Sequence, residues 1–333
     1  MEKAKVLITG LGGIAQVAHL PILSKMENVE IAGVCDIDKS KSRTIAQKYN
    51  VKNFYTSLEE MLSAVPADCL VVTSPTNLHT EQAILGFEKG LNVLVEKPLA
   101  RNYEEASKIV EAAKKANKRL MVGMNNRFRP DIMMQESFVS AKEIGEVFYV
   151  KTGFLKKRST DEKWSVNKNE AGGGVFIDLG IVVLDIALWI LKFPKVKSVS
   201  AVNYYHSFKD VEDSSFVFIK FENGSTVSIE TSWTLNREND IFYCNVYGKE
   251  GSSSINPLRI YKQMHETLVN VTPIKMEKPA NIFKRSYEYE ISHFINSVIS
   301  GKPSLSDGTE ALDRMKIVDA VYESARTGKE VLF

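Results

Sequence analysis

Two groups of residues in this sequence have the types and spacing of a chemical site. Glu96-Lys97-Pro98 follows a short apolar run, which places a lysine beside a carboxylate where a buried strand is expected to end. The surroundings of such a lysine can tune its pKa, so it can donate or accept a proton near neutral pH. The alternative is a surface ion pair, which these three residues alone do not exclude.

The second group lies on an apolar segment that follows Gly172-Gly173-Gly174. Asp178, Val182 and Asp185 are spaced i, i+4 and i+7 and therefore share one face of a helix. Because a buried charge is costly unless it is paired, two carboxylates on this face need an explanation. Either they belong to a polar site, or Asp178 caps the helix and Asp185 forms a structural ion pair.

A glycine-rich motif points to a nucleotide. Gly10-Leu11-Gly12-Gly13-Ile14-Ala15 fits the pattern G-x-G-x-x-G/A, with Ala15 in the third small position. The first glycine allows a tight turn, the second lets the backbone approach a pyrophosphate, and the small third residue lets the helix pack on the strand. The predicted strand 5–9 before it and helix 14–26 after it are the setting in which this motif binds a dinucleotide.

Asp36 closes the next predicted strand, 29–35, at the distance from the glycines that such a site requires. Its carboxylate can accept hydrogen bonds from the ribose hydroxyls and repels a 2′-phosphate, which favours NAD over NADP. Lys39, Lys41 and Arg43 follow closely and could offset this repulsion, so NADP stays an alternative cofactor.

The elements that must position these residues form two domains. In residues 1–123, apolar runs alternate with helical patterns, which predicts parallel βαβ units that bind ligands beyond the carboxyl ends of the strands. In residues 124–333, longer strands alternate apolar and polar residues, and Glu222-Asn223-Gly224 is a hairpin-type turn. This half is predicted to hold a largely antiparallel sheet with one covered face. The predicted strands are 5–9, 29–35, 69–73, 92–95 and 120–123, then 147–154, 196–202, 215–221, 226–233 and 241–247; the predicted helices are 14–26, 40–49, 80–89 and 103–116, then 178–191, 287–300 and 308–327.

Composition excludes several classes of function. The 333 residues carry a formal net charge of +2, which gives no reason to expect binding to nucleic acid or to a membrane surface. We found no run of about 18 consecutive apolar residues, the length a membrane span needs. Cys35, Cys69 and Cys244 are too scattered for a disulfide framework or a CxxC zinc site, so no metal is expected, and they suit a reducing cytoplasm.

Over its whole length the sequence resembles the Gfo/Idh/MocA oxidoreductases, which are named for glucose–fructose oxidoreductase and inositol dehydrogenase. The resemblance rests on the glycine motif, Asp36, Glu96-Lys97-Pro98, the triple glycine and Asp178-Leu179-Gly180. It implies an N-terminal doubly wound Rossmann domain and a C-terminal α/β domain with a large, open, mostly antiparallel sheet. That sheet is expected to form a homodimer or homotetramer, and Pro98 is expected to be cis and to aim Lys97 into a cleft.

The resemblance and the predicted strand ends together assign candidate site residues. Lys97 and Asp178 fall on the catalytic Lys and Asp of the family, and Lys97, Arg127, Lys156, Trp164, Asp178 and Val182 are the candidates for the substrate pocket. The expected cofactor-binding residues are Gly10, Gly12, Gly13, Ile14, Ala15, Asp36, Ser74, Pro75, Asn77, His79, Glu96, Lys97, Asn125 and Arg127.

One position departs from the family pattern. The family's catalytic His is expected four residues after Asp178, in the order D-x-G-x-H, and this sequence has Val182 there. Hydride transfer to or from an alcohol carbon needs a group that moves the hydroxyl proton, and such a group contributes roughly 100- to 10,000-fold in rate. Either Lys97 takes this role, or the second domain supplies another group, or catalysis has been lost.

The expected function is therefore an NAD(P)-dependent dehydrogenase or ketoreductase that acts on a sugar or polyol. The missing His motivates a rival, a cofactor-binding regulator or assembly subunit without turnover. A second rival is a glycosidase or lyase that uses bound NAD as an internal redox agent. The presence of Lys97, Asp178 and Asp185 together favours an active enzyme.

Overall fold

The computed structural model describes residues 3–158, 163–234 and 238–333. The chain divides into two compact units. The first comprises Met1–Asn125 and Phe283–Leu312, and the second comprises Asn126–Ile282 and Asp313–Phe333.

The first unit is built on a six-stranded parallel sheet with the order β3-β2-β1-β4-β5-β6. The strand order reverses beside β1, which makes the carboxyl ends of β1 and β4 the expected ligand-binding edge. Every residue of β4 is buried, which is why these strands are short continuous apolar runs in the sequence. The predicted doubly wound parallel sheet is confirmed. The strands are β1 (Ala4–Thr9), β2 (Val29–Cys35), β3 (Asn53–Tyr55), β4 (Cys69–Val72), β5 (Asn92–Glu96) and β6 (Leu120–Gly123).

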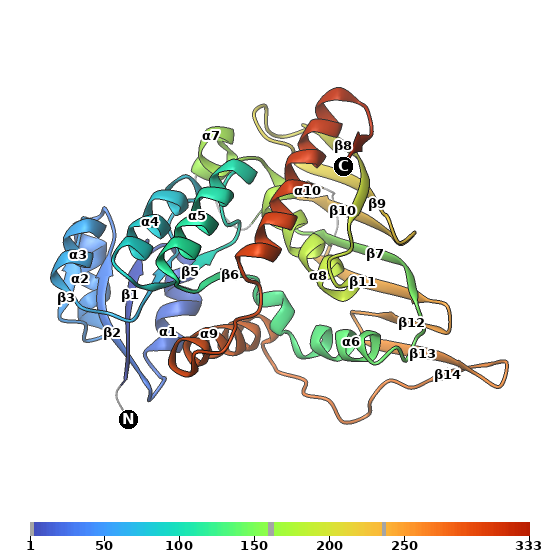
Figure 1. The fold of residues 1–333 in the computed structure, drawn as a ribbon, viewed down its shortest axis with the longest axis horizontal. Helices are drawn as coiled ribbons and strands as arrows, with labels where there is room; N and C mark the ends of the chain where they lie inside the picture. The colour runs from blue at the N-terminus through green and yellow to red at the C-terminus, as the bar shows by residue number, and fades with distance from the viewer. Residues whose placement is uncertain (1–2, 159–162, 235–237) are drawn as a thin grey trace. The chain divides into compact units, whose positions relative to one another are not determined.

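Helices connect these strands, and α4 and α5 lie side by side (Figure 1). Side chains fix several helix starts: Asp38, Ser57 and Asn102 each accept a hydrogen bond from a backbone N–H in the first turn of α2, α3 and α5. The sequence patterns did not indicate β3 or α3, because three and seven residues are too short to show a clear period. The helices are η1 (Ala15–His19), α1 (Leu20–Leu23), α2 (Lys39–Lys48), α3 (Leu58–Ala64), α4 (Thr76–Glu88), α5 (Tyr103–Ala116) and α9 (Ile282–Ser300).

A late segment of the chain, Phe283–Leu312, returns to the first unit. A division of the chain at residue 124 places this segment in the second domain instead. The backbone N–H of Val122 donates to the carbonyl of Ser306 at 2.9 Å, and Met121 pairs with Asp307 in an isolated antiparallel bridge. Asn125 donates from its side-chain amide to the Ser286 hydroxyl of α9 at 2.9 Å. The spacing of apolar residues in a segment predicts that it forms a helix, but not the unit on which the helix packs. The sequence therefore could not predict that this segment belongs to the first unit.

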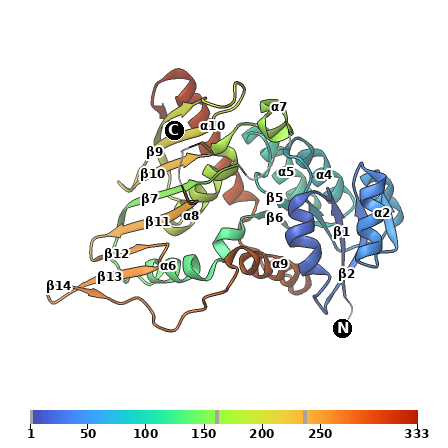
Figure 2. The same cartoon turned by 180° about the vertical axis from the view of Figure 1, so that it is seen from behind.

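The second unit is built on a nine-stranded sheet with the order β14-β13-β12-β11-β7-β10-β9-β8-β15, seen from behind in Figure 2. All neighbouring strands are antiparallel except β7 and β10, so the predicted large, mostly antiparallel sheet is confirmed. The turn between β9 and β10 contains Gly224 at φ 85°, a conformation that favours glycine. The strands are β7 (Val147–Leu155), β8 (Val196–Tyr204), β9 (Ser214–Phe221), β10 (Thr226–Ser232), β11 (Ile241–Gly248), β12 (Gly251–Ser254), β13 (Arg259–Met264), β14 (Thr267–Asn270) and β15 (Val331–Leu332).

One face of this sheet is covered by α8, which packs on β7, β10 and β11. The segment Lys168–Leu191 is the one stretch in the described residues that is long and apolar enough to cross a membrane, and 83% of its most apolar window is buried in the structure, as in a core helix. The other helices of the unit are α6 (Pro130–Ser140), η3 (Lys163–Val166), α7 (Lys168–Ala171) and η4 (Phe176–Gly180), which continues into α8 (Ile181–Leu191). η2 (Asn125–Phe128) and α10 (Gly308–Thr327) begin in the first unit and end in the second.

Candidate dinucleotide and substrate sites

The glycine loop lies at the carboxyl end of β1 and has the shape of a phosphate cradle. Gly10 has φ 82°, and a Cβ there would lie 2.4 Å from the backbone N of Ser74, so only glycine allows the ends of β1 and β4 to approach this closely. A Cβ on Gly12 or Gly13 would meet no atom within 4 Å. This open space beside backbone N–H groups, just before the helix that starts at Ala15, is where a pyrophosphate fits. Gly10, Gly12, Gly13, Ile14 and Ala15 are therefore the residues that would hold it.

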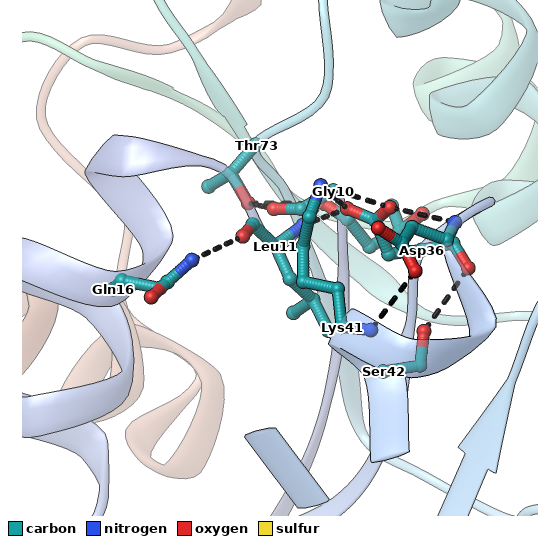
Figure 3. Close-up of polar contacts among 9 residues, drawn as sticks. Gly10, Leu11, Gln16, Asp36, Lys41, Ser42 and Thr73 are labelled. Atoms are coloured by element: carbon teal, nitrogen blue, oxygen red, sulfur yellow. Dashed lines mark hydrogen bonds and ion pairs between the residues drawn. The ribbon is translucent and has the colours of Figure 1, made fainter. Parts of the chain in front are cut away.

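Asp36 follows β2 and lies beside this loop (Figure 3). Its carboxylate is buried and accepts the Leu11 N–H at 2.8 Å on Oδ2 and the Asp38 N–H at 3.0 Å on Oδ1. The ammonium of Lys41 lies 3.2 Å from both oxygens, and the Ser42 hydroxyl donates to the Asp36 carbonyl at 3.0 Å. Lys41, one of the three basic residues expected near Asp36, is thus paired with it.

The segment after β4 contributes four of the predicted cofactor residues. Pro75 precedes the first residue of α4, and the Ser74 hydroxyl donates to the side-chain carbonyl of Gln82 at 2.8 Å. The Oδ1 atom of Asn77 is buried and has no hydrogen-bond partner among the described residues. The ring of His79 is 1% exposed, and its nitrogens face backbone carbonyls. The structure therefore places His79 inside the unit rather than on a surface open to a cofactor.

Glu96 and Lys97 stand at the carboxyl end of β5, and the Lys97–Pro98 peptide bond is cis, as predicted. Lys97 is half-buried, and its backbone N–H donates to Glu96 Oε2 at 3.2 Å. Glu96 is buried, and its Oε1 lies 2.8 Å from Nε2 of His19 in η1. Glu96 is therefore a buried, paired carboxylate, not part of a surface ion pair. No local pattern indicated His19 as a partner of Glu96, because 77 residues separate the two.

In the second unit, the triple glycine allows close packing before η4. A Cβ on Gly173 would lie 2.0 Å from the Tyr322 hydroxyl, and a Cβ on Gly174 would lie 2.0 Å from the Glu212 carbonyl. The Glu212 carboxylate accepts the N–H groups of Gly174 and Phe176 at 3.0 and 2.9 Å. Burial raises the pKa of Glu212, and these hydrogen bonds together with one from Tyr322 oppose that rise. Glu212 thus fixes the start of the helix that carries Asp178.

Asp178 is the third residue of η4 and does not cap it, since Val175 occupies the cap position. Its Oδ2 accepts a hydrogen bond from Trp233 Nε1 at 3.2 Å, and its side chain is half-buried. Trp233 follows β10 and was not predicted as a site residue. Val182 lies one turn further along in α8 and is 7% exposed.

Asp185 forms a buried ion-pair network with two arginines. Arg127 donates from Nε and Nη2 to its two oxygens at 2.7 and 2.6 Å, and Arg314 donates from Nη1 at 2.6 Å. All three side chains are at most 1% exposed, and the rings of Trp189 and Phe193 cover the Arg127 guanidinium. The structural ion pair considered for Asp185 is therefore what the structure contains. The Arg127 guanidinium has no exposed surface and is paired with Asp185, and its expected cofactor and substrate roles stay predictions.

Of the remaining candidates, Asn125 is buried, and Lys156 and Trp164 are half-buried. Asn125 uses its amide on Ser286, within the first unit. Lys156 directly follows β7 and is half-buried, with its N–H donating to the Ser232 carbonyl at 2.9 Å. Trp164 lies in η3 and is also half-buried. The structure brings the glycine loop, Asp36, Ser74 and Lys97 to the carboxyl ends of one parallel sheet, and it places Asp178, Val182, Lys156 and Trp164 in the other unit.

A parallel sheet with this strand order, a glycine cradle after β1 and an acidic residue after β2 define a dinucleotide-binding domain joined to a second α/β domain. Comparison with known proteins agrees. Residues 4–124 match the family model described as the oxidoreductase family, NAD-binding Rossmann fold, and residues 137–333 match the model of its C-terminal alpha/beta domain. The chain belongs to the Gfo/Idh/MocA oxidoreductase family, and its first unit is an NAD-binding domain.

Similar proteins cover essentially the whole chain. D-glucoside 3-dehydrogenase of Escherichia coli is 32% identical over 98% of this chain and 97% of its own length. The scyllo-inositol 2-dehydrogenase (NAD(+)) of Bacillus subtilis is 25% identical over 99% of this chain and 96% of its own length. Among solved structures, levoglucosan dehydrogenase in complex with NADH has the same fold, with a TM-score of 0.90 at 21% identity over 99% of both chains.

Proposed function

We propose that this oxidoreductase transfers a hydride between a nicotinamide dinucleotide and a hydroxyl or keto carbon of a sugar or polyol. The observation that carries the proposal is the glycine cradle with Asp36 in the same unit as Lys97, which stands at the end of β5. The sugar and polyol class is supported by the names of the two curated relatives, which are dehydrogenases of a glucoside and of an inositol.

When bound, the nicotinamide cofactor would supply hydride-transfer chemistry at a carbinol or keto carbon. In the oxidation direction this chain must take up the hydroxyl proton. Lys97 binds the reacting oxygen and takes its proton, and reduction runs these transfers in reverse. Asp178, held by Trp233, orients a substrate hydroxyl. Lys156 and Trp164 are the further candidates for substrate contacts. Val182 stands where a His is expected from the resemblance, so the proton transfer falls to Lys97 alone.

The direct test is turnover. Purified protein, stripped of bound nucleotide and supplied with NAD⁺, is expected to form NADH when it is offered a panel of sugars and polyols, and this is measured by absorbance. Formation of a hydrolysed or eliminated product without net NADH would instead establish the glycosidase or lyase alternative. Tight NAD binding without any product across the panel would favour the regulator or assembly-subunit alternative.

A second prediction concerns the choice of cofactor. We expect NAD(H) to bind more tightly than NADP(H), because the buried Asp36 carboxylate repels a 2′-phosphate. Lys41 is the cation that could meet that phosphate, so Lys41→Gln should weaken NADP(H) binding by about 10-fold and leave NAD(H) nearly unchanged. Calorimetric titration of nucleotide-free protein measures both affinities.

Lys39→Gln is the matched control for this titration. Lys39 is exposed two residues before Lys41, and no ion pair joins it to Asp36 in the described part of the chain. Unchanged NADP(H) affinity in Lys41→Gln would show that Lys41 serves only to neutralise Asp36. Tighter binding of NADP(H) than of NAD(H) by the native protein would show that the attraction of Lys41 for the 2′-phosphate exceeds the repulsion by Asp36.

We also infer a homodimer or homotetramer formed through the open face of the nine-stranded sheet. Val202, Phe216 and Phe218 share that face and are 52, 40 and 38% exposed, which is unusual for large apolar side chains on one sheet surface.

The three cysteines are free and buried, which supports a reducing cytoplasm as the location.

A further inference from the structure

Two buried histidines in the first unit hold the segment that contains Lys97. The first is His79 of α4, which is 1% exposed. Its Nδ1 lies 2.9 Å from the carbonyl oxygen of Pro98, and its Nε2 lies 2.9 Å from the carbonyl oxygen of Ser74. Ser74 follows β4 and Pro98 is the neighbour of Lys97, so one imidazole bridges the ends of two adjacent strands.

The two carbonyl contacts of His79 depend on the protonation state of its imidazole. A neutral ring has one N–H and can donate to only one of the two carbonyls, whereas an imidazolium can donate to both. Burial lowers the pKa of His79, and the two carbonyls and the nearby Glu96 carboxylate oppose that effect. In either state at least one hydrogen bond ties the ring to the backbone at a strand end.

The second histidine is His19, which lies in η1 directly after the glycine loop. Its side chain has no exposed surface, and its Nε2 is 2.8 Å from Glu96 Oε1. The ring of Tyr287 from α9 packs edge-on against it, with 5.7 Å between the ring centroids (Figures 1 and 2 show α9). Glu96 in turn accepts the backbone N–H of Lys97 on its other oxygen.

The surroundings of Glu96 are shaped to hold its carboxylate. A Cβ on Gly123, at the end of the neighbouring strand β6, would lie 3.2 Å from the Glu96 Cδ and Oε2 atoms, which is closer than side chains normally pack. Burying a carboxylate is costly unless it is paired, and His19 supplies that pair. A buried pair of this kind is a weak way to gain stability, since apolar residues of similar volume are often as stable. Its position next to Lys97 therefore suggests a role in placing this lysine.

We propose that His19 and His79 are positioning residues that fix the backbone on both sides of Lys97 to two segments, the helix after the glycine loop and the end of β4. His19 acts through Glu96 on the Lys97 N–H and comes from the helix after the glycine loop. His79 acts on the Pro98 carbonyl and is anchored on Ser74, beside Gly10. A displacement of about 1 Å of a reacting group can cost on the order of 100-fold in rate. The inference rests on the proposed role of Lys97 in proton transfer.

The test compares variants that break each contact with variants that keep it. His19→Leu and His79→Leu remove the polar contacts, and His19→Gln retains an amide nitrogen that can reach Glu96. His293→Leu is the matched control, because His293 lies in the same unit but its ring meets a different segment. Its Nε2 accepts the Leu305 N–H at a distance of 2.9 Å. For each folded variant we would measure kcat, KM, the Kd for NAD⁺ by calorimetry, and the unfolding midpoint.

We expect kcat at saturating NAD⁺ and sugar to fall at least about 10-fold in His19→Leu and His79→Leu, with the Kd for NAD⁺ changed less than about threefold. His19→Gln should recover most of the loss, and His293→Leu should match the native protein. A kcat that is unchanged per folded molecule would overturn the proposal, since a merely structural contact alters only the unfolding midpoint. A loss in NAD⁺ affinity as large as the loss in kcat would overturn it too, because the histidines would then serve the cofactor.

A second readout does not depend on catalysis. The rate at which an amine-reactive acylating reagent labels Lys97, measured by peptide mass spectrometry, reports the exposure and proton affinity of its amine. This rate should change severalfold in the two Leu variants and not in His293→Leu, with exposed Lys115 as the internal reference. If Lys97→Ala proves fully active, the proposed function of Lys97 fails, while the labelling result still decides whether the histidines position it. If His19→Leu does not fold, His19→Asn replaces it, because the shorter amide ends before the Nε2 position that meets Glu96. If His79→Leu does not fold, His79→Gln replaces it, because one extended amide cannot meet both the Pro98 and the Ser74 carbonyls.

Discussion

Replacement of Lys97 by alanine should lower kcat/KM by at least about 100-fold and leave NAD⁺ affinity nearly intact. Lys97 is half-buried at the carboxyl end of β5, in the same unit as the glycine cradle, and it follows a carboxylate that is itself paired with His19. With Val182 in the position of the expected histidine, no other group is assigned to the hydroxyl proton in the proposed mechanism. The loss should therefore be the full contribution of an acid–base group, about 100- to 10,000-fold.

The measurement is a steady-state assay with the best substrate from the sugar panel, together with calorimetry for NAD⁺. Lys115→Ala is the control, since Lys115 is an exposed lysine on α5 of the same unit. A fall of less than about threefold would remove Lys97 from the mechanism. An equally large loss of NAD⁺ affinity would identify Lys97 as a cofactor ligand instead.

Val182→His gives the complementary arm of this experiment. If Lys97 already carries the proton, a histidine one turn beyond Asp178 should raise activity little, or lower it by crowding the substrate. A gain on the order of 100-fold would show that the native site lacks its proton-transfer group. That result would also favour a regulator or assembly subunit as the native role, because the native chain would then lack an efficient route for the proton.

Local spacing was sufficient to predict the NAD-binding domain. Residues 4–23 form a strand, a glycine turn and a helix, and each depends on residues close to it in the sequence. Asp36 follows at the fixed spacing that the motif requires. The same holds for the sheets, because buried parallel strands appear as short apolar runs and half-covered antiparallel strands alternate. The sequence patterns did not indicate β3, α3 or the short strands β12, β13, β14 and β15, because elements of two to seven residues show no clear period. The 11-residue helix α6 was not predicted either.

Partners that meet only in the folded chain could not be predicted in this way. Trp233 is 55 residues from Asp178, and Arg314 is 129 residues from Asp185. In the sequence, Asp185 was an acidic residue on an otherwise apolar helix, and both a site role and an ion pair were open. The structure shows the ion pair, because Arg127 and Arg314, which come from distant segments, both contact the Asp185 carboxylate.

This network leads to the second large effect, on stability. Asp185→Asn should destabilise the protein by about 3–5 kcal/mol, because it leaves the guanidinium groups of Arg127 and Arg314 buried without a counter-charge. Arg127→Met should cost less, since Asp185 then keeps Arg314 and the methionine can fill the space against Trp189. The measurement is the urea midpoint of unfolding of each variant without cofactor, which avoids stabilisation by bound NAD.

Glu104→Gln is the control for that series, because Glu104 pairs with Lys108 on the surface of α5 and its loss should not move the midpoint. The comparison also decides between two roles for Arg127, which resemblance placed among the ligands of cofactor and substrate. If Arg127→Met left the midpoint unchanged and raised KM for the sugar, the guanidinium would be a substrate ligand and its contact with Asp185 incidental. If the midpoint falls and kcat per folded molecule holds, Arg127 is a structural partner of Asp185. The second outcome is expected, because the Arg127 guanidinium has no exposed surface and donates two hydrogen bonds to the Asp185 carboxylate.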